Sequence, residues 1–285
     1  MRTSLLIIFL FSCFFSEAQN ESSNKNSFIK QSLVDNNVDS THNSEFKKHI
    51  RVSFIGIYSK VNSNMRLEGS RGILSSQINF EDHLGLDDVK NIYAVTVVTR
   101  LTPHSGLYGS FYTLNRKNTI QLEEDLPIEN DTLKKGLLVD GYFNTTVFSL
   151  GYLHSILKKE NAFLGVYVNL YIIKISAGIR SEIFDINKST ALLAPLPNFG
   201  ILSAFQLNKS FSIAGSLGIF FIDNENMTGT FIDANLGVSY NPTSWIGATL
   251  GYYVFDVRVG WPIDKVYGYA NYNYGGPSLG ITFKL

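Results

Sequence analysis

Cysteine is almost absent from this sequence, and Cys13, the one present, lies in an N-terminal segment that we expect to be removed. The mature chain then has neither a disulfide nor a thiolate ligand for a metal. An excess of charge is also absent, because 24 basic residues balance 24 acidic ones, so no overall field attracts nucleic acid or an acidic partner. From His49 onward, no stretch is long and apolar enough for a transmembrane helix. Function therefore has to be inferred from local features.

The N-terminus has the features of a secretory signal peptide over residues 1–18. The basic residue Arg2 precedes an apolar run from Leu5 to Phe15, and Ser16 and Ala18 offer small side chains to a signal peptidase. The run is about half of the roughly 20 residues that a helix needs to cross a bilayer. An export signal is therefore favoured over a permanent anchor.

A polar leader, residues 19–47, follows the signal peptide. It is rich in Asn, Ser, Asp and Lys, so it cannot bury enough apolar surface to offset the entropy of ordering. An alternative interpretation of the N-terminus is a lipoprotein, because Leu10–Cys13 loosely resembles a lipoprotein box that would make Cys13 a lipidated residue. Two phenylalanines continue the apolar run beyond that cysteine, which favours the signal peptide. Residues 48–285 are predicted to form one domain.

Within that domain, apolar side chains recur at every second position. The segment from Phe211 to Ile219 places mostly bulky apolar residues at odd positions and Ser, Ala or Gly at even ones. Successive side chains of a strand point to opposite faces, so the pattern predicts one face suited to lipid and one suited to a crowded interior. Similar apolar rows are Leu164, Val166, Val168, Leu170 and Ile172; Ile232, Ala234, Leu236, Val238 and Tyr240; Ile246, Ala248, Leu250, Tyr252 and Val254; and Leu279, Ile281, Phe283 and Leu285.

Short polar turns alternate with longer polar loops between these strands. The short turns are predicted at residues 102–105, 158–161, 208–210 and 241–244, and the long loops at about 59–90, 115–140, 178–197, 223–229 and 259–272. Together they connect ten strands, and short inner turns with longer outer loops are typical of bacterial outer-membrane barrels. The predicted fold class is all-β: a transmembrane antiparallel up-and-down β-barrel of about ten strands, closed so that no sheet edge meets lipid.

The alternative fold is a secreted soluble β-sandwich or a barrel of the lipocalin kind. Strands of such proteins also alternate, but their outward face is polar. In this sequence one face is apolar and the other is small or polar, and Tyr and Phe lie near strand ends as interfacial girdles require. The chemistry of the two faces therefore favours the membrane barrel.

Four landmarks resemble a group of uncharacterised small Gram-negative outer-membrane β-barrel proteins. Ile78–Asp87 is similar to an acidic DLGLD element in the first outer loop, with His83 where an acidic residue is more usual. Tyr152–Ser155 resembles a strand end before an inner turn. Ala194–Gly200 contains an APLP motif, and Gly276–Gly280 a GPxLG motif that opens the last strand.

The resemblance implies an outer-membrane location and contact with the barrel assembly machinery during biogenesis. Such barrels usually end on Phe, which that machinery recognises, whereas this chain ends on Leu285 with Phe283 two residues earlier. Outer-membrane lipid and lipopolysaccharide are the other expected partners, and no nucleic acid partner is expected. The group has no activity that can be carried over to this chain.

Catalytic patterns known from lipid-hydrolysing outer-membrane barrels are absent from the sequence. His154 precedes Ser155, but adjacent residues of a strand face opposite sides of the sheet, so the two cannot form a nucleophile and base pair. No Cys/His spacing predicts a metal site, and no glycine-rich stretch has the helix or Lys of a phosphate-binding loop. We therefore expect no enzyme activity, no metal and no cofactor.

An acidic loop around His83 offers the nearest approach to a metal site. Carboxylate oxygens suit hard cations, and this loop could hold a divalent cation linked to lipopolysaccharide. A solvated acidic loop is the simpler interpretation. The carboxylates concerned are those of Glu81, Asp82, Asp87 and Asp88.

Weak candidates for a binding site lie on the polar face of the predicted strands. Asp233 and Asn235 form a polar row, and Arg100, Asp256 and Arg258 are expected nearby in the lumen. A barrel of about ten strands has an interior little wider than the side chains that fill it, so these groups are expected to form a polar plug.

The sequence favours a non-enzymatic outer-membrane barrel with surface-exposed loops and a plugged or narrow lumen. The first alternative is a channel for small solutes or hydrophobic compounds. The second is an enzyme that modifies lipid A or phospholipid.

Overall fold

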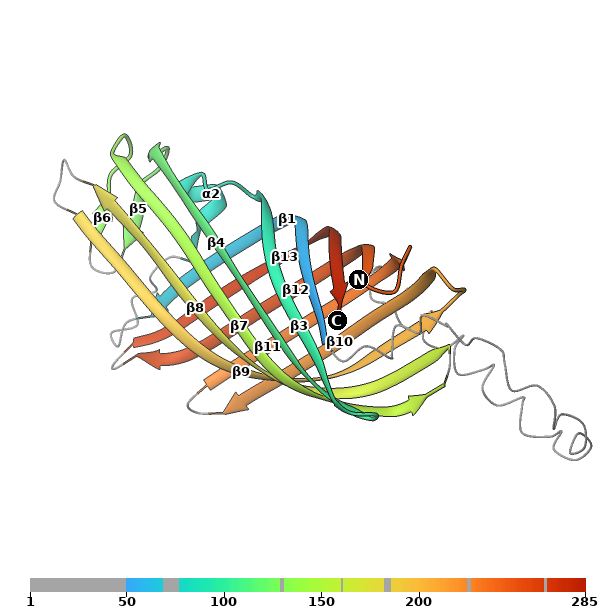
Figure 1. Cartoon of the computed structure of the whole chain (residues 1–285). Helices are drawn as coiled ribbons and strands as arrows, with labels where there is room; N and C mark the ends of the chain where they lie inside the picture. The colour runs from blue at the N-terminus through green and yellow to red at the C-terminus, as the bar shows by residue number, and fades with distance from the viewer. Residues whose placement is uncertain are drawn as a thin grey trace, which may run out of the picture. The chain divides into compact units, whose positions relative to one another are not determined.

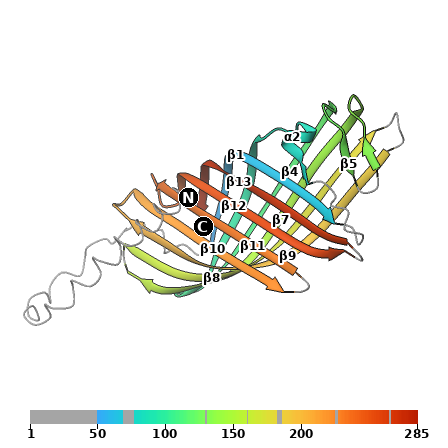
Figure 2. The same cartoon turned by 180° about the vertical axis from the view of Figure 1, so that it is seen from behind.

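The computed structural model describes residues 50–68, 77–128, 131–159, 161–181, 186–224, 227–263 and 266–285. The predicted signal peptide (1–18) and polar leader (19–47) lie outside these residues. The described residues form a closed antiparallel β-barrel, as predicted (Figures 1 and 2).

The main sheet has eleven strands, of which β2 (Ile78–Asn79) is a two-residue strand paired to β1, so ten long strands form the wall. The sheet order follows the chain order, which is the up-and-down topology. The wall strands are β1 (Ile50–Glu68), β3 (Val89–Thr102), β4 (Ser105–Gln121), β7 (Leu138–Lys158), β8 (Ala162–Ser181), β9 (Ile186–Gln206), β10 (Phe211–Asn224), β11 (Met227–Tyr240), β12 (Ile246–Ile263) and β13 (Val266–Lys284). Three further elements are α2 (Phe80–Leu84), β5 (Leu126–Ile128) and β6 (Asp131–Leu133).

The last strand closes the barrel, as its alternating pattern suggests. β13 pairs with β1 from Arg51 opposite Lys284 to Glu68 opposite Tyr267. Its apolar row faces outward, with Leu279 62% and Ile281 46% exposed. Closure gives the backbone groups of both strands a partner, which is what allows a sheet to sit in lipid.

The two faces of the wall carry the side chains that the sequence assigns to them. On β8, Val168 and Leu170 are exposed on the outside, whereas Asn169 and Tyr171 are buried inside. Ile219 on β10 and Leu236 on β11 also face outward. Apolar residues therefore cover the outer surface.

Aromatic side chains border this apolar belt at both ends. Tyr58, Tyr93 and Tyr252 are exposed near the outer edge of the belt, and Tyr240 and Trp245 are exposed beside the inner turns. Beyond the outer edge the outward face becomes polar: on β8, Lys174 follows the apolar row that ends at Ile172, at the next outward position. Such girdles mark the two boundaries between membrane and water.

The inner turns lie where predicted, but several of the predicted outer loops are in fact strand. β8 runs to Ser181 and β9 begins at Ile186, so most of the predicted loop 178–197 belongs to the wall. β7 has 21 residues, about twice the 9–11 needed to cross a bilayer. The prediction was wrong because outside lipid the outward face turns polar while the hydrogen-bonded ladder continues.

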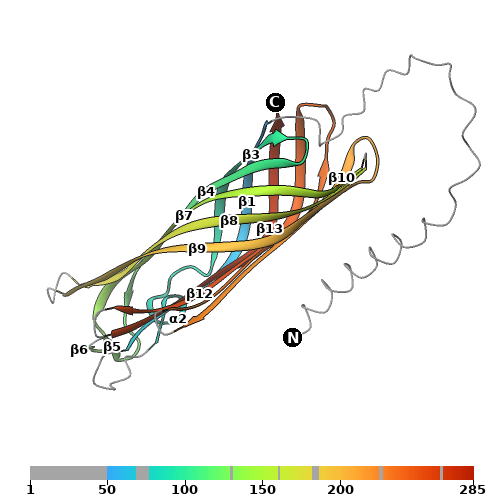
Figure 3. The ribbon, with the colours of Figure 1, turned by 90° about the horizontal axis from the view of Figure 1, so that it is seen from below.

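The two ends of the barrel differ in what lies at them. α2, β5 and β6 lie at the outer end, and the end of β13 lies at the opposite, inner end together with the turn between β3 and β4 (Figure 3). None of the helices in the described part of the chain has the length and hydropathy needed to cross a membrane.

Candidate functional site in the barrel lumen

The helix α2 is short and is defined by its two caps. The side chain of Asn79 accepts hydrogen bonds from the backbone N–H groups of Glu81 and Asp82, both at 3.0 Å. Gly85 ends the helix with φ of +59°, a left-handed conformation that glycine adopts without steric cost. Two carboxylates in the first turn suit the positive end of the helix dipole.

Apolar packing holds α2 against the lumen wall. Phe80 and Leu84 are buried, and the ring of Phe80 meets that of Phe143 edge-on at 4.9 Å. Leu84 lies over Gly141, where a Cβ atom would come within 2.9 Å of the Leu84 Cβ, so any larger residue there would push the helix away. Asn118 Nδ2 donates to the carbonyl oxygen of Gly85 at 2.8 Å. The helix is therefore docked on β4 and β7.

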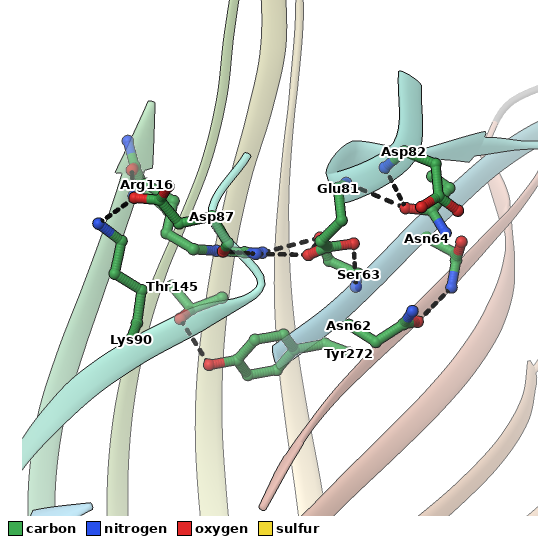
Figure 4. Close-up of polar contacts among 12 residues, drawn as sticks. Asn62, Ser63, Asn64, Glu81, Asp82, Asp87, Lys90, Arg116, Thr145 and Tyr272 are labelled. Carbon is green, nitrogen blue, oxygen red and sulfur yellow. Dashed lines mark hydrogen bonds and ion pairs between the residues drawn. The ribbon is translucent and has the colours of Figure 1, made fainter. Parts of the chain in front are cut away.

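A buried ion pair joins α2 to the wall (Figure 4). The Arg116 side chain from β4 is fully buried, and its Nη1 pairs with Glu81 Oε1, whose side chain is 8% exposed. Arg116 Nη2 donates to Ser63 Oγ at 2.7 Å, and the Ser63 N–H and hydroxyl donate to the two Glu81 oxygens at 2.9 Å each. The guanidinium carbon lies 5.3 Å from the centre of the Phe143 ring.

Because the Arg116–Glu81 ion pair is buried, it contributes more to the position of α2 than to the stability of the barrel. Two buried charges give little net stability, but removal of one leaves the other uncompensated, at a cost of about 3 to 5 kcal/mol. Glu81 has its partners only while α2 is docked. The pair therefore fixes the position of the helix rather than adding much to the stability of the barrel.

Next to this pair, aromatic rings from six strands pack across the lumen and form what we call the aromatic layer. Tyr171 meets Phe231 at 4.7 Å, Phe231 meets Phe255 at 5.1 Å, and Phe255 stacks on Tyr274 at 4.9 Å. The contacts continue through Tyr272 to Phe143 and thus to α2. The aromatic layer consists of Tyr112, Phe143, Tyr171, Phe231, Tyr253, Phe255, Tyr272 and Tyr274; all except the partly buried Tyr253 are at most 5% exposed.

Between the aromatic layer and the inner turns, the lumen face of β10 to β13 is made of small and polar residues; we call this part of the barrel interior the inner lumen. Ser216, Gly237 and Thr249 face inward and are partly exposed, and Asn235 is exposed. Asn235 Nδ2 donates to Ser216 Oγ at 2.6 Å. Solvent therefore reaches the inner lumen.

Three of the predicted candidates face the lumen. Asp233 is 5% exposed beneath the aromatic layer, and its carboxylate accepts a hydrogen bond from the Tyr253 hydroxyl. Asn235 lies in the inner lumen, and Arg100 lies on the lumen face at the inner end of β3, opposite Gly106.

Asp256 and Arg258 do not face the lumen, so the predicted lumen position of these two residues is wrong. They share the even, outward register of β12 with Leu250, Tyr252 and Val254. Arg258 Nη2 pairs with Asp256 Oδ2 at 2.8 Å on the outer face. They are charged because they lie beyond the outer edge of the apolar belt, where the outer surface meets water.

The acidic loop around His83 is organised by hydrogen bonds and ion pairs. His83 Nδ1 accepts from the Asn79 N–H at 3.0 Å. Lys90 Nζ pairs with Asp87 Oδ2 at 2.5 Å, and this contact lowers the pKa of the Asp87 carboxyl below its ordinary value. Among the residues that the structure describes, no three His, Cys, Asp or Glu side chains gather in a way that could hold a metal ion.

A shallow groove of about 270 Å³ lies on the outer face, over the seam between β1 and β13. Tyr58, Tyr93, Leu250 and Leu279 line it together with Pro277. The groove belongs to the apolar belt of the outer face.

Comparisons with known proteins identify the fold. No protein-family model matches the chain, and no curated protein matches its sequence significantly. The outer membrane protease OmpT from Escherichia coli is similar over 83% of this chain and 97% of that chain, with 13% identity and a TM-score of 0.53. The translocator domain of the autotransporter NalP from Neisseria meningitidis matches over 83% of this chain and 88% of that chain, with 10% identity and a TM-score of 0.38. At such identities the likeness concerns the fold alone.

The fold and the apolar belt together place the chain in the membrane. Closed barrels and helices are the structures that satisfy their backbone hydrogen bonds within lipid. An even-stranded barrel with an outward apolar belt is the architecture of bacterial outer-membrane proteins. The chain is therefore an outer-membrane β-barrel. The comparisons do not test the four sequence landmarks, and the resemblance to the narrower group stays a prediction.

Proposed function

We propose that the protein is a non-catalytic outer-membrane barrel that is closed at the aromatic layer and presents its outer end as a binding surface. The observation that carries the proposal is the unbroken set of ring contacts from Tyr171 to Phe143, continued by the docked α2. These ring contacts support closure, because a channel would need a polar, hydrated path at the same level of the lumen. A barrel of ten strands has little width to spare for such a path.

The buried ion pair supports a fixed plug rather than a gate. Undocking α2 would expose Phe80 and Leu84 and would leave Arg116 buried without its carboxylate. The cost is of the order of several kcal/mol. Opening would need an equally strong compensating interaction in the open state.

The positions of the histidines support the absence of catalysis. His154 faces outward at the inner end of β7, on the side away from the lumen, and His104 is exposed in a turn. His83 accepts a hydrogen bond from the backbone N–H of Asn79, the residue that caps the N-terminus of α2. In the described residues, none of these three imidazoles is hydrogen-bonded to both a nucleophile and a carboxylate, the arrangement of an activated nucleophile.

The outer face supports lipopolysaccharide as a partner. Lys117 on β4 and Lys174 on β8 are exposed at outward positions beyond the apolar belt, at the level where lipid phosphates lie. Lysine ammonium groups bind phosphate as point charges. Contact with the barrel assembly machinery belongs to the same proposal, and it rests on the alternating last strand.

Conductance in planar lipid bilayers tests the closed lumen. The refolded wild-type chain should give no single-channel steps, whereas a variant with Phe231→Ala and Phe255→Ala should conduct because it removes two rings of the aromatic layer. Reproducible wild-type steps that disappear in Asp233→Asn but persist in Arg258→Gln would contradict closure, since Asp233 faces the lumen and Arg258 faces outward.

Mass spectrometry of the outer membrane tests the absence of catalysis. Lipid A and phospholipid from cells with and without the gene should have the same masses. A mass difference that is restored by the wild-type gene would show an enzyme acting on lipid.

A further inference from the structure

A buried carboxylate lies on the lumen face, on the inner side of the aromatic layer. Asp233 on β11 is 5% exposed, and its carboxylate accepts a hydrogen bond from the neutral hydroxyl of Tyr253. Of the ion pairs in the described part of the chain, none involves Asp233. Charges buried in proteins are paired with an opposite charge or coordinate a metal ion. The groups around Asp233 indicate which of these applies.

A buried asparagine near this carboxylate has an amide group without hydrogen bonds. Asn198 on β9 is 0% exposed, and neither its Oδ1 nor its Nδ2 atom has a hydrogen-bond partner among the residues that the structure describes. Such groups are rare in folded proteins, because an unpaired buried amide costs free energy. The amide of Asn198 is therefore available as a ligand.

Oxygen-bearing side chains gather at Gly218 on β10, because glycine leaves room for them. A Cβ atom at this position would come within 1.9 Å of Asn198 Oδ1 and 2.5 Å of the Tyr167 hydroxyl oxygen. Gly218 is also the direct cross-strand partner of Asp233, and the Cβ positions of such partners are about 4.5 to 5.5 Å apart. A carboxylate, an amide oxygen and a phenol oxygen thus surround one glycine.

The inner lumen gives access to these groups. Ser216 and Asn235 occupy the next lumen-facing positions of β10 and β11 toward the inner turns; Ser216 is partly exposed and Asn235 is exposed. The two side chains are hydrogen-bonded to each other and border Asp233 with neutral polar groups. A small ion from the periplasmic side can therefore approach Asp233 without passing the aromatic layer.

We infer that Asp233, Asn198 and Tyr167 form a binding site for a single hard metal cation. Carboxylate and amide carbonyl oxygens are the protein ligands that such cations take. Asp233 supplies the charge, and Asn198 Oδ1 and the Tyr167 hydroxyl oxygen supply neutral ligands. Affinity rises with the number of charged ligands, so a site with one carboxylate binds weakly. The inference does not depend on closure of the lumen at the aromatic layer.

Terbium luminescence tests this site, because Tb³⁺ is a hard cation that emits when a nearby tyrosine is excited. The refolded full chain would be placed in nanodiscs of phosphatidylcholine, which has no net charge, and titrated with Tb³⁺. Wild type should show saturable emission, and Asp233→Asn should weaken binding about tenfold or more, because it removes the charged ligand and keeps the shape of the side chain. Asn198→Asp should strengthen binding, because it adds a second carboxylate.

Asp256→Asn is the matched control, since it makes the same substitution on the outer face of β12. It should bind Tb³⁺ as wild type does, and heat-modifiable gel migration should show that each variant is folded. Acidic loops at the outer end bind Tb³⁺ equally in wild type and Asp233→Asn, so the difference between these two isolates the lumen site. Absence of that difference, or an equal loss in Asp256→Asn, would overturn the inference. A protonated Asp233 with a purely structural role predicts this second result.

Competition identifies the cation. Ca²⁺ and Na⁺ would each be added to wild type loaded with Tb³⁺, at constant ionic strength. Ca²⁺ should displace Tb³⁺ at the lower concentration if the ligand is divalent, and Na⁺ should be at least as effective if it is monovalent. If neither displaces Tb³⁺ from the site that Asp233→Asn removes, the site binds the lanthanide alone and the inference is overturned.

Discussion

The outer and inner halves of the lumen are built from the same ten strands but from different side chains. In the outer half, Phe255, Tyr272 and Tyr274 are at most 2% exposed, and α2 docks beside them. In the inner half, the lumen-facing positions of β10 to β13 are small or polar, and Asn235 is exposed inside the barrel. The lumen therefore consists of an aromatic part with buried rings and a polar part with exposed side chains.

The proposed closure of this narrow barrel therefore rests on its outer half. Large rings bury much apolar area and form favourable edge-on and offset contacts, so the outer half carries stability. In the inner half, the small and polar side chains of β10 to β13 form fewer contacts of this kind. Substitutions in the two halves should therefore differ in their effects.

The largest expected effect is that of Phe255→Ala in the aromatic layer. Removal of a fully buried ring costs about 3 to 5 kcal/mol of unfolding free energy, because a cavity remains. Thr249→Ala, on the same strand but in the inner lumen, should cost about 1 kcal/mol or less, since it removes one exchangeable hydroxyl contact. Urea unfolding in lipid vesicles measures both, and equal losses would mean that the two halves are packed alike.

Arg116→Met should come next, at about 3 kcal/mol, because Glu81 would stay buried without its partner. Hydrogen exchange should also rise in residues 79–86 as α2 undocks. Adding Glu81→Leu should recover most of the loss, since the double variant leaves no buried charge. If the double variant is no more stable than the single one, the ion pair does not position α2.

Substitutions at two neighbouring residues of β11 compare the cost of placing a charge on the outward face and on the lumen face of the wall. Leu236→Arg places a charge in the apolar belt and should cost about 2 to 4 kcal/mol. Asn235→Arg places the same charge in the wet inner lumen and should cost much less. The free energies of folding into vesicles provide the measurement, and a larger loss at Asn235 would reverse the assigned orientation of the strand.

The smallest effect is expected at the outer loop that contains β5 and β6. The Lys135 N–H and the Lys134 ammonium lower the pKa of the exposed Asp125 carboxyl below its ordinary value of 3.8. A lowered pKa means that the contact stabilises the loop above about pH 4 and is lost as the pH falls through the folded-state pKa. The protection factor of the Lys135 amide, which is corrected for the intrinsic pH dependence of exchange, should therefore fall at acidic pH in wild type, whereas in Asp125→Asn it should be similar at both pH values. A pH response that survives in Asp125→Asn would rule out this carboxyl as its source.

The barrel could be predicted from the sequence because alternation is a local property. The rows around Leu170 and Leu236 show it directly, and the inner turns are marked by polar residues. On β12 the outward-facing positions have even numbers, as Leu250 and Tyr252 show. The same alternation assigns Asp256 and Arg258 to the outer face. Their predicted place in the lumen was wrong because charge was given more weight than register.

The docked helix and its ion pair were missed, because no local pattern links Glu81 to Arg116 across 35 positions of sequence. The sequence contains a weak signal: Asn79, the acidic residues after it and Gly85 mark a capped turn within the predicted solvated loop. The aromatic layer was missed for a different reason. Its rings lie at the inward-facing positions of their strands, which the alternating pattern marks as small or polar. A single tyrosine at such a position, such as Tyr171 or Tyr272, shows nothing unusual, because its side chain has both a ring and a hydroxyl group.

The separation of the two halves is tested most directly by thiol labelling at Asn235. Single-cysteine variants Asn235→Cys and Lys117→Cys, each with Cys13→Ser, would be reconstituted into liposomes and treated with a small, charged, membrane-impermeant thiol reagent. Labelling of Lys117→Cys reports the barrels whose outer end faces the medium. In that population Asn235→Cys should stay unlabelled until the liposomes are lysed and should then react rapidly. Labelling of Asn235→Cys through the outer end of intact liposomes would show that the aromatic layer does not close the lumen.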